Sequence, residues 1–207
     1  MSDDYKIILR GVLQFLFGAL LSVAAFRFYV WSGRHPLAVE SWIEVAQEAV
    51  LFLSALLFAA AARRTPDRRG GLVLVSGFLF SMLIREFDGM FDLIVHGFWK
   101  YVLMVFLCGV ARQVAAAGRA TVVPGLAHFI ASRSFVFMLT GCVIVLVYSR
   151  LFGMKGLWEF FSSACTGWEH AKTFSEESTE LLGYAFMFIS GISYLCELAA
   201  EKRQRPD

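Results

Sequence analysis

The sequence predicts an all-α integral membrane protein with six transmembrane helices, and three observations lead to this prediction. Hydrophobic residues make up 58% of the 207 residues and charged residues only 17%, whereas soluble domains have about 45–50% and about 25%. The mean hydropathy is +0.63. Six apolar runs are close to or above the length of about 20 residues that an α-helix needs to cross the hydrocarbon core of a bilayer.

These six runs define the predicted helices of a single transmembrane domain that covers the whole chain. They are 7–30, 41–62, 71–95, 98–115, 134–152 and 177–199. Gly97 lies between the third and fourth runs and predicts a tight turn with a helical hairpin. The segment 116–133 contains Pro124 and Gly125, which we expect to break any helix. The segment 153–176 has the composition of an interfacial element that lies along the membrane surface between the fifth and sixth helices.

The distribution of charge predicts that both termini lie in the cytoplasm. In this orientation the cytoplasmic segments hold twelve of the 19 Lys and Arg residues but only six of the 17 Asp and Glu residues, as the positive-inside rule requires. All five Trp residues fall at the outer boundary, where amphipathic aromatic rings are favoured. The first run is too long for a signal-peptide core, so we expect a retained helix. The Ala- and Arg-rich composition favours a bacterial inner membrane.

Two classes of function receive no support from the composition. The net charge of +2 is too small to indicate nucleic-acid binding. The four Cys residues are scattered without a C-x-x-C pair, so they define neither a disulfide framework nor a zinc finger. The partners that we expect are therefore membrane lipid, a lipid-like substrate or another membrane protein.

Ionisable residues collect in the outer half of the third predicted helix. We expect each of them to have a structural or functional role, because a charge inside a bilayer costs about 2.5–3.5 kcal/mol on insertion scales. At about 100° per residue, four of these side chains share one face within an arc of about 80°. They are Arg85, Asp88, Asp92 and His96. Glu86 points about 100° away from Arg85, toward a different neighbour.

The second and sixth predicted helices bring acidic stripes to the same depth. The stripes consist of Glu40, Glu44 and Glu48 on the second helix and of Glu177, Glu180 and Tyr184 on the sixth. Glu48 is the deepest residue of its stripe, about two turns below the surface. An earlier start of the sixth helix would add His170 and Thr173. If the three polar faces turn toward one another, they form an acidic, His-containing cavity that opens to the outer side.

This cavity predicts a divalent metal ion, with zinc favoured. His and carboxylate side chains are the usual ligands of zinc, manganese and iron. Asp92 and His96 stand at positions i and i+4 of one helix, a spacing that lets both reach one ion. The predicted metal ligands are Asp92, His96, His170, Glu177 and Glu180. The arrangement resembles that of intramembrane zinc hydrolases of the alkaline-ceramidase and adiponectin-receptor type, without the His-x-x-x-His pair that these enzymes carry on a late helix.

The leading functional hypothesis is a metal-dependent hydrolase that acts on a lipid or amphipathic substrate at the outer face. A metal ion with an open position activates water, and Glu48 or Asp88 would serve as the general base. Arg85 completes the predicted catalytic residues. The other predicted cavity residues are Glu44, Glu86 and Tyr184.

Two other classes of function stay open. A non-enzymatic membrane subunit would use the same charges to fix helix register or to hold a partner, with a carboxylate as the counter-ion of Arg85. A proton or cation transporter would relay charge along the carboxylates. The stretches 50–62 and 71–84 contain no charged residue, which argues against a continuous polar path through the membrane.

Overall fold

The computed structural model describes residues 36–162 and 168–204, together with Val12, Leu16, Leu20 and Arg27. Side chains are described in the continuous part from Trp42 onward, except those of 160–162 and His170. The chain divides into two compact units, Met1–Trp42 and Ile43–Asp207. The second unit contains the helical core.

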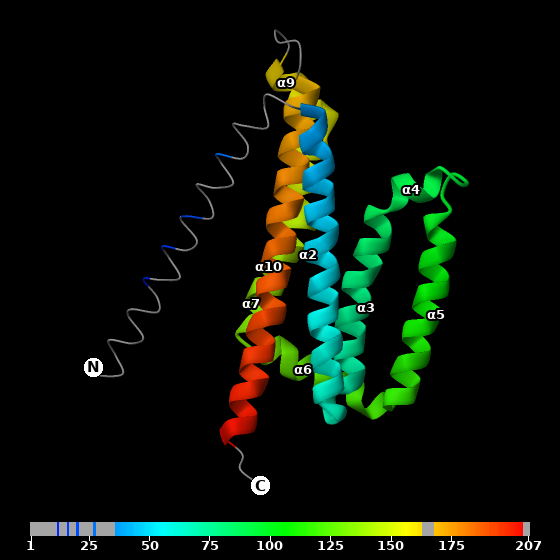
Figure 1. Cartoon of the computed structure of the whole chain (residues 1–207), viewed down its shortest axis with the longest axis vertical. Coiled ribbons are helices and arrows are strands. Elements are labelled where there is room, and N and C mark those ends of the chain that lie inside the picture. The colour runs from blue at the N-terminus through cyan, green and yellow to red at the C-terminus, as the bar shows by residue number, and fades with distance from the viewer. Residues whose placement is uncertain are drawn as a thin grey trace. The chain divides into compact units, whose positions relative to one another are not determined.

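Every element in the described residues is helical, and no strand is present among them (Figure 1). The long helices are α2 (Pro36–Arg64), α3 (Arg69–Glu86), α5 (Trp99–Ala117), α7 (Ser134–Val143) and α10 (Trp168–Gln204). The short elements are η1 (Pro66–Arg68), α4 (Asp88–Asp92), η2 (Arg119–Thr121), α6 (Val122–Ala131), the π-helical segment η3 (Ile144–Ser149), α8 (Arg150–Gly153) and α9 (Lys155–Ser162). The prediction of an all-α protein is confirmed for this part of the chain.

Within the described residues, four helical stretches are long and apolar enough to cross a membrane. They are Trp42–Arg64, Trp99–Ala117, Ser134–Gly153 and Ala171–Gln204. α3 has 18 residues and carries Arg69, Arg85 and Glu86 at its two ends. Apart from Val12, Leu16, Leu20 and Arg27, the predicted first helix, 7–30, lies outside the described residues. The four apolar stretches support the prediction of a transmembrane protein.

The helices of the second unit pack side by side in the order α7, α10, α2, α3 and α5. α10 packs on α7 and η3, and α3 packs on α5 and α6. α2 lies between α10 and α3, where Gln47 bonds to Glu177 and Ser76 donates a hydrogen bond of 2.8 Å to the carbonyl oxygen of Ala55. Figure 1 shows α10 beside the part of α2 that follows Trp42, until the two helices separate toward the C-terminal end of α10.

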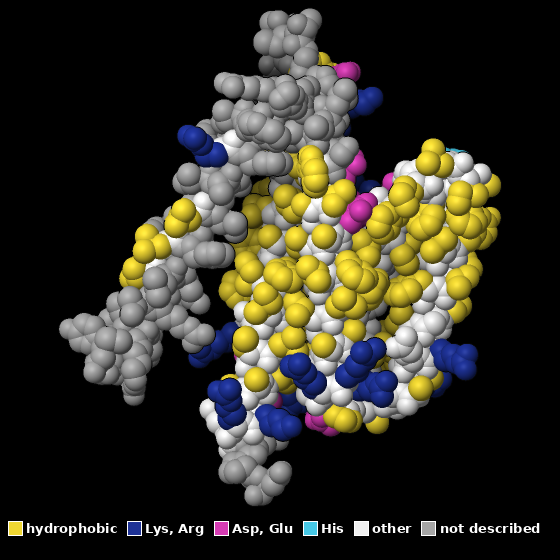
Figure 2. Space-filling model, in the orientation of Figure 1, with side chains coloured by type: hydrophobic (Ala, Val, Ile, Leu, Met, Phe, Trp, Pro, Cys, Tyr) yellow, Lys and Arg dark blue, Asp and Glu magenta, His cyan; other side chains and the backbone are white. Residues whose placement is uncertain are grey.

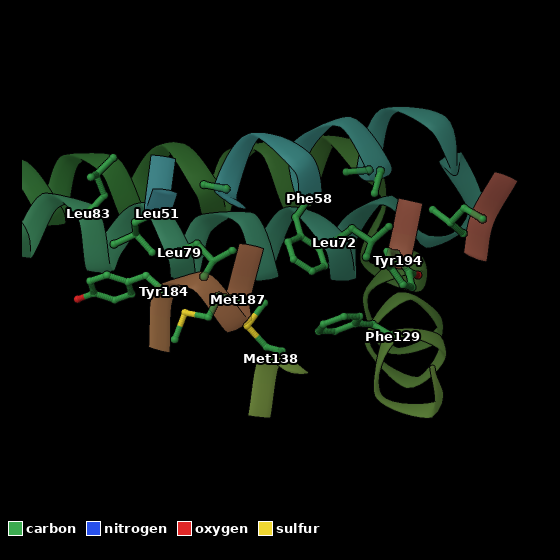
Figure 3. Packing of buried hydrophobic residues seen from close by; sticks show 14 of the residues in the cluster. Leu51, Phe58, Leu72, Leu79, Leu83, Phe129, Met138, Tyr184, Met187 and Tyr194 are labelled. Carbon is green, nitrogen blue, oxygen red and sulfur yellow. The ribbon is translucent and has the colours of Figure 1, made fainter. Parts of the chain in front are cut away.

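Buried apolar side chains fill the space between these helices (Figure 3). On α2 the buried residues Leu51, Ala55, Phe58 and Ala62 recur at intervals of three and four, which is the period of one helix face. They meet Leu72, Leu79 and Leu83 of α3, Phe129 of α6, Met138 of α7, and Tyr184, Met187 and Tyr194 of α10. Such close packing holds membrane helices together, because lipid tails are as apolar as the side chains themselves.

Two glycines let α7 and α10 approach each other closely. A Cβ atom built on Gly141 would lie 2.5 Å from the carbonyl oxygen of Gly183. Neither position therefore has room for a larger residue without a shift of one helix. Small residues at a helix crossing are common in membrane proteins, since they bring two backbones into contact.

The third predicted helix, 71–95, is not continuous, and this prediction is wrong. α3 ends at Glu86, and Phe87 separates it from the short helix α4. Gly89 is the second residue of α4, and glycine is among the poorest residues for a helix interior. The predicted hairpin with α5 is present, and Gly97 makes its turn with φ of +78°, in the left-handed region that favours glycine.

The prediction that Pro124 and Gly125 break any helix in 116–133 is also wrong, because α6 contains both residues. Pro124 lies in the first turn of α6, where backbone N–H groups have no partner within the helix, so its missing N–H is tolerated. Gly125 is buried, and a Cβ atom there would collide with the carbonyl oxygen of Arg68.

The predicted interfacial segment, 153–176, contains two different structures. Its first part forms α9, and residues 163–167 lie outside the described residues. Its last part already belongs to α10, which begins at Trp168 and not at 177. The earlier start of α10 places Glu176 within the same helix as Glu177 and Glu180.

His128 of α6 lies in a hydrogen-bonded cluster with side chains of η1 and α10. Its Nδ1 atom is 3.0 Å from Oη of Tyr194, and its Nε2 atom is 2.8 Å from Oε1 of Glu201. Arg68 donates a hydrogen bond of 3.1 Å to the same carboxylate. The cluster joins η1, α6 and α10 at the end of the helices where α2 terminates and α3 begins.

Candidate functional site

A cavity of about 390 Å³ opens at the other end of the helices, where α3 ends. It is lined by Glu44, Gln47, Glu48, Arg85, Glu86, Phe87, Asp88, Gly89, Met90, Arg150, Glu176, Glu177 and Glu180. Figure 2 shows Asp and Glu side chains near the upper ends of the helices, whereas Lys and Arg side chains gather at the lower ends. Seven carboxylates and two guanidinium groups face this one space, which we call the acidic cavity.

Gln47 ties α2 to α10 at the wall of the acidic cavity. Its side chain is 1% exposed and lies beside Glu44, because positions i and i+3 are neighbours on one helix face. The Nε2 atom of Gln47 donates to the carbonyl oxygen of Glu177 at 2.8 Å and to Oε2 of the same residue at 2.9 Å. The bonds fix the Glu177 carboxylate at the cavity wall.

The end of α3 supplies a cation and an anion side by side. Arg85 Nη1 lies 3.6 Å from Oε1 of Glu86, and the Glu86 carboxylate also accepts a hydrogen bond of 2.7 Å from the hydroxyl of Tyr184. Tyr184 is completely buried. The sequence predicted that Glu86 faces a neighbour different from that of Arg85, and Tyr184 of α10 is that neighbour.

Glu180 is the most enclosed carboxylate of the acidic cavity, at 4% exposure. Its Oε1 atom accepts a hydrogen bond of 2.6 Å from the Ser149 hydroxyl and one of 2.8 Å from Arg150. Arg150 also lies 3.8 Å from Glu176, which Lys172 approaches to 3.2 Å. Ser149 is the last residue of the π-helical segment η3, and such segments are frequent at functional sites.

Three other carboxylates of the acidic cavity carry no such partner. Within the described part of the chain, no ion pair joins Glu44, Glu48 or Asp88 to a basic side chain. Glu44 is exposed, and Glu48 and Asp88 are partly exposed, so their charges can attract a cation that enters the cavity. The acidic cavity therefore has an excess of negative charge.

Asp92 and His96 lie outside the acidic cavity. Asp92 accepts hydrogen bonds from His96 Nδ1 at 2.9 Å and from the backbone N–H of Gly97 at 2.8 Å, so it stabilises the turn before α5. The His96 side chain is 97% exposed. The predicted shared face of Arg85, Asp92 and His96 required an unbroken helix, and the interruption at Phe87 directs the last two elsewhere.

The described residues contain no group of three His, Cys, Asp or Glu side chains placed to hold one metal ion. The side chain of His170 is not among the described ones. The predicted metal site, which combined His170 with Asp92 and His96, therefore stays a prediction. Of the predicted ligands, only Glu177 and Glu180 line the acidic cavity.

Sequence reasoning missed four residues that shape the acidic cavity: Gln47, Ser149, Arg150 and Glu176. Gln47 had a usable signal, since it lies beside Glu44 on one helix face. Arg150 also had one, because it ends the fifth apolar run at the same depth as the acidic stripes. The role of Ser149 depends on the π-helical turn, which no sequence pattern indicated.

Comparison with protein-family models, with curated proteins and with solved structures finds no match to this chain. Its function must therefore be inferred from the chemistry of the acidic cavity. The surrounding helices are apolar, and low-dielectric walls strengthen the attraction between the carboxylates and a cation. The cavity can accept a positively charged group, and its two arginines can orient a second, polar end of the same ligand.

Proposed function

We propose that this protein is a multi-pass membrane protein that binds a small organic cation in the acidic cavity. The observation that carries the proposal is the imbalance of charge, seven carboxylates against two guanidinium groups around one space. An ammonium group would be attracted by Glu44, Glu48 and Asp88, which have no basic partner among the described side chains. The volume of about 390 Å³ is within the range of small-molecule pockets.

The proposal includes the topology predicted from the sequence. Six transmembrane helices with both termini in the cytoplasm would place the basic ends of α2 and α10 inside, as the positive-inside rule favours. The acidic cavity would then open to the outer face of a bacterial inner membrane. A ligand would reach it from outside the cell.

A purely structural charge network is the first alternative. Part of the acidic cavity fits that role, because Arg150 pairs with Glu180 and Arg85 with Glu86. Glu44, Glu48 and Asp88 take no part in these pairs, and a network that only held helices together would not need them. The excess of carboxylates thus favours a site that a cation completes.

A metal-dependent hydrolase or a cation transporter would use the same carboxylates. The hydrolase would need Glu48 or Asp88 as a general base beside a metal ion, and the transporter would need a polar path through the apolar half of α2 and α3. The described residues contain no group of three possible metal ligands. Binding of an organic cation requires neither feature, so it is the function that we propose first.

Isothermal titration calorimetry on the purified full-length protein tests the proposal. The probes are 1,4-diaminobutane, tetramethylammonium chloride, magnesium chloride and zinc chloride. We expect saturable binding of the diamine that weakens as sodium chloride is raised, because salt screens the attraction. Glu48→Gln should weaken this binding by about fivefold, the effect of one charge contact of about 1 kcal/mol.

Glu159→Gln is the matched control, since Glu159 is exposed on α9 and does not line the acidic cavity. It removes the same charge and should leave binding unchanged. Binding of zinc without binding of either organic cation would favour the metal-dependent hydrolase instead. Absence of binding for all four probes would contradict the proposal and favour the structural network.

A further inference from the structure

A second cavity, of about 230 Å³, lies between α2, α3 and α5 near the end of the helices opposite to the acidic cavity. Its walls are mostly apolar and include Leu56, Val73, Phe80 and Phe106. The buried hydroxyl of Ser76, which also lines it, donates its hydrogen bond to the carbonyl oxygen of Ala55. The Ser76 hydroxyl is therefore already satisfied, and we call this space the α2–α3–α5 groove.

The mouth of the α2–α3–α5 groove is basic. Arg63, at the end of α2, and Arg69, at the start of α3, both line it and are exposed. No ion pair joins either of them to an acidic side chain within the described residues. The neighbouring Arg68, by contrast, is paired with Asp67 and Glu201.

The position of Arg69 adds a second electrostatic argument. Arg69 is the first residue of α3, and the N-terminal end of a helix carries a partial positive charge that disfavours a cation. An anion beside Arg69 would be attracted both by the guanidinium group and by the helix end. Gln113 of α5 also lines the mouth and provides a neutral hydrogen-bond donor.

In a membrane, the groove would face lipid along its α5 side. The apolar stretch Trp99–Ala117 is only 6% buried inside the protein, and Figure 1 shows α5 at the edge of the row of helices, beside α3. The groove matches the two parts of an anionic phospholipid. Its apolar walls suit an acyl chain, and its cationic mouth suits the headgroup. Basic pockets between membrane helices are known to recognise anionic headgroups.

We propose that the α2–α3–α5 groove binds an anionic phospholipid, with its phosphate between Arg63 and Arg69 and one acyl chain along the apolar walls. Arginine suits this role because its planar guanidinium group can donate two parallel hydrogen bonds to phosphate. The inference depends on insertion in a membrane and not on the ligand of the acidic cavity. It can therefore fail or succeed independently of the proposed cation binding.

Native mass spectrometry of the delipidated full-length protein tests this inference. Phosphatidylglycerol and phosphatidylcholine with the same acyl chains are titrated separately. We expect phosphatidylglycerol to bind more tightly than phosphatidylcholine. The double variant Arg63→Gln/Arg69→Gln should bind phosphatidylglycerol about 25-fold more weakly, at about fivefold for each arginine. Binding of phosphatidylcholine should change little.

Arg112→Gln/Arg119→Gln is the matched control, because both arginines are exposed in the same region of α5 and η2 but do not line the groove. It removes the same charge and should keep the preference for phosphatidylglycerol. Ala59→Leu places a larger side chain in the groove. It should weaken the binding of lipid without changing the charge of the mouth.

Three results would overturn the inference. Equal affinity for the two lipids would show that the basic mouth does not select an anionic headgroup. Equal losses in the two double variants would show that only the overall charge matters. Saturation of the same arginines by glycerol 3-phosphate, with no gain from acyl chains, would assign them to a soluble phosphate. Thermal unfolding of each variant checks that the protein is folded.

Discussion

Tyr184 of α10 donates a hydrogen bond of 2.7 Å to the carboxylate of Glu86 at the end of α3. The two residues are far apart in the sequence, and the tyrosine ring is completely buried among apolar side chains. The bond therefore couples the hydrophobic core to the wall of the acidic cavity. A change of packing at Tyr184 would move Glu86, and a change of charge at Glu86 would strain the core.

The first prediction concerns this bond. Tyr184→Phe keeps the ring and removes the hydroxyl, so the partly buried Glu86 loses a donor. We expect a loss of stability of about 1–2 kcal/mol, and a melting temperature about 2–6 °C lower in detergent. Tyr148→Phe is the control, because Tyr148 is 52% exposed. Equal melting temperatures for the two variants would contradict the described role of the bond.

The second prediction concerns the pair of Arg150 and Glu180. Arg150→Ala leaves the buried carboxylate of Glu180 with only the Ser149 hydroxyl, which should cost about 2 kcal/mol. Glu180→Gln in the same chain should recover most of this loss, because a neutral amide needs no counter-charge. Thermal unfolding of the two single variants and the double variant measures the coupling. Purely additive effects would show that the pair contributes nothing.

The gathering of acidic residues could be predicted from the sequence because charges are rare in apolar helices and need a common environment. The depth of each residue along its helix followed from its distance to the helix end. On this basis Glu48 of α2, Arg85 of α3 and Glu177 of α10 were expected near one another, and all three line the acidic cavity. Their chemical roles stay proposals.

The error at Asp92 and His96 arose from the assumption of a continuous helix. The apolar residues after Gly89 extend the run to 95 and resemble a membrane span, although Asp88 and Gly89 together form a turn signal. The prediction followed the hydropathy of residues 71–95 and did not use this turn signal. The contribution of Ser149 could not be predicted, since a π-helical turn changes which residues share a face.

The third prediction concerns the orientation in the membrane. Lys155 on α9 and Arg203 near the end of α10 are both exposed. In a chain whose four Cys residues are replaced by Ala, Lys155→Cys should react with a membrane-impermeant maleimide in intact cells. Arg203→Cys should react only after the cells are permeabilised. The reverse pattern would place the acidic cavity at the cytoplasmic face and contradict the proposed topology.

The fourth prediction concerns the crossing of α7 and α10. Gly141→Ala places a methyl group against the backbone of Gly183, and a backbone oxygen cannot move aside as a flexible side chain can. We expect the melting temperature to fall by several degrees, in line with a cost of about 1–3 kcal/mol for overpacking. Gly109→Ala is the matched control, since no atom lies within 4 Å of the added Cβ.

The two glycine substitutions share the same gain in helix propensity, so the difference between them isolates the contact at the crossing. Gly141→Leu should prevent folding, because no rotamer avoids α10. Ser149 follows in the same stretch as Gly141, so Gly141→Ala should also displace the hydroxyl that binds Glu180 and weaken cation binding. An unchanged melting temperature for Gly141→Ala would contradict the close contact of Gly141 with Gly183. In that case this contact would not hold Ser149 and Arg150 against Glu180.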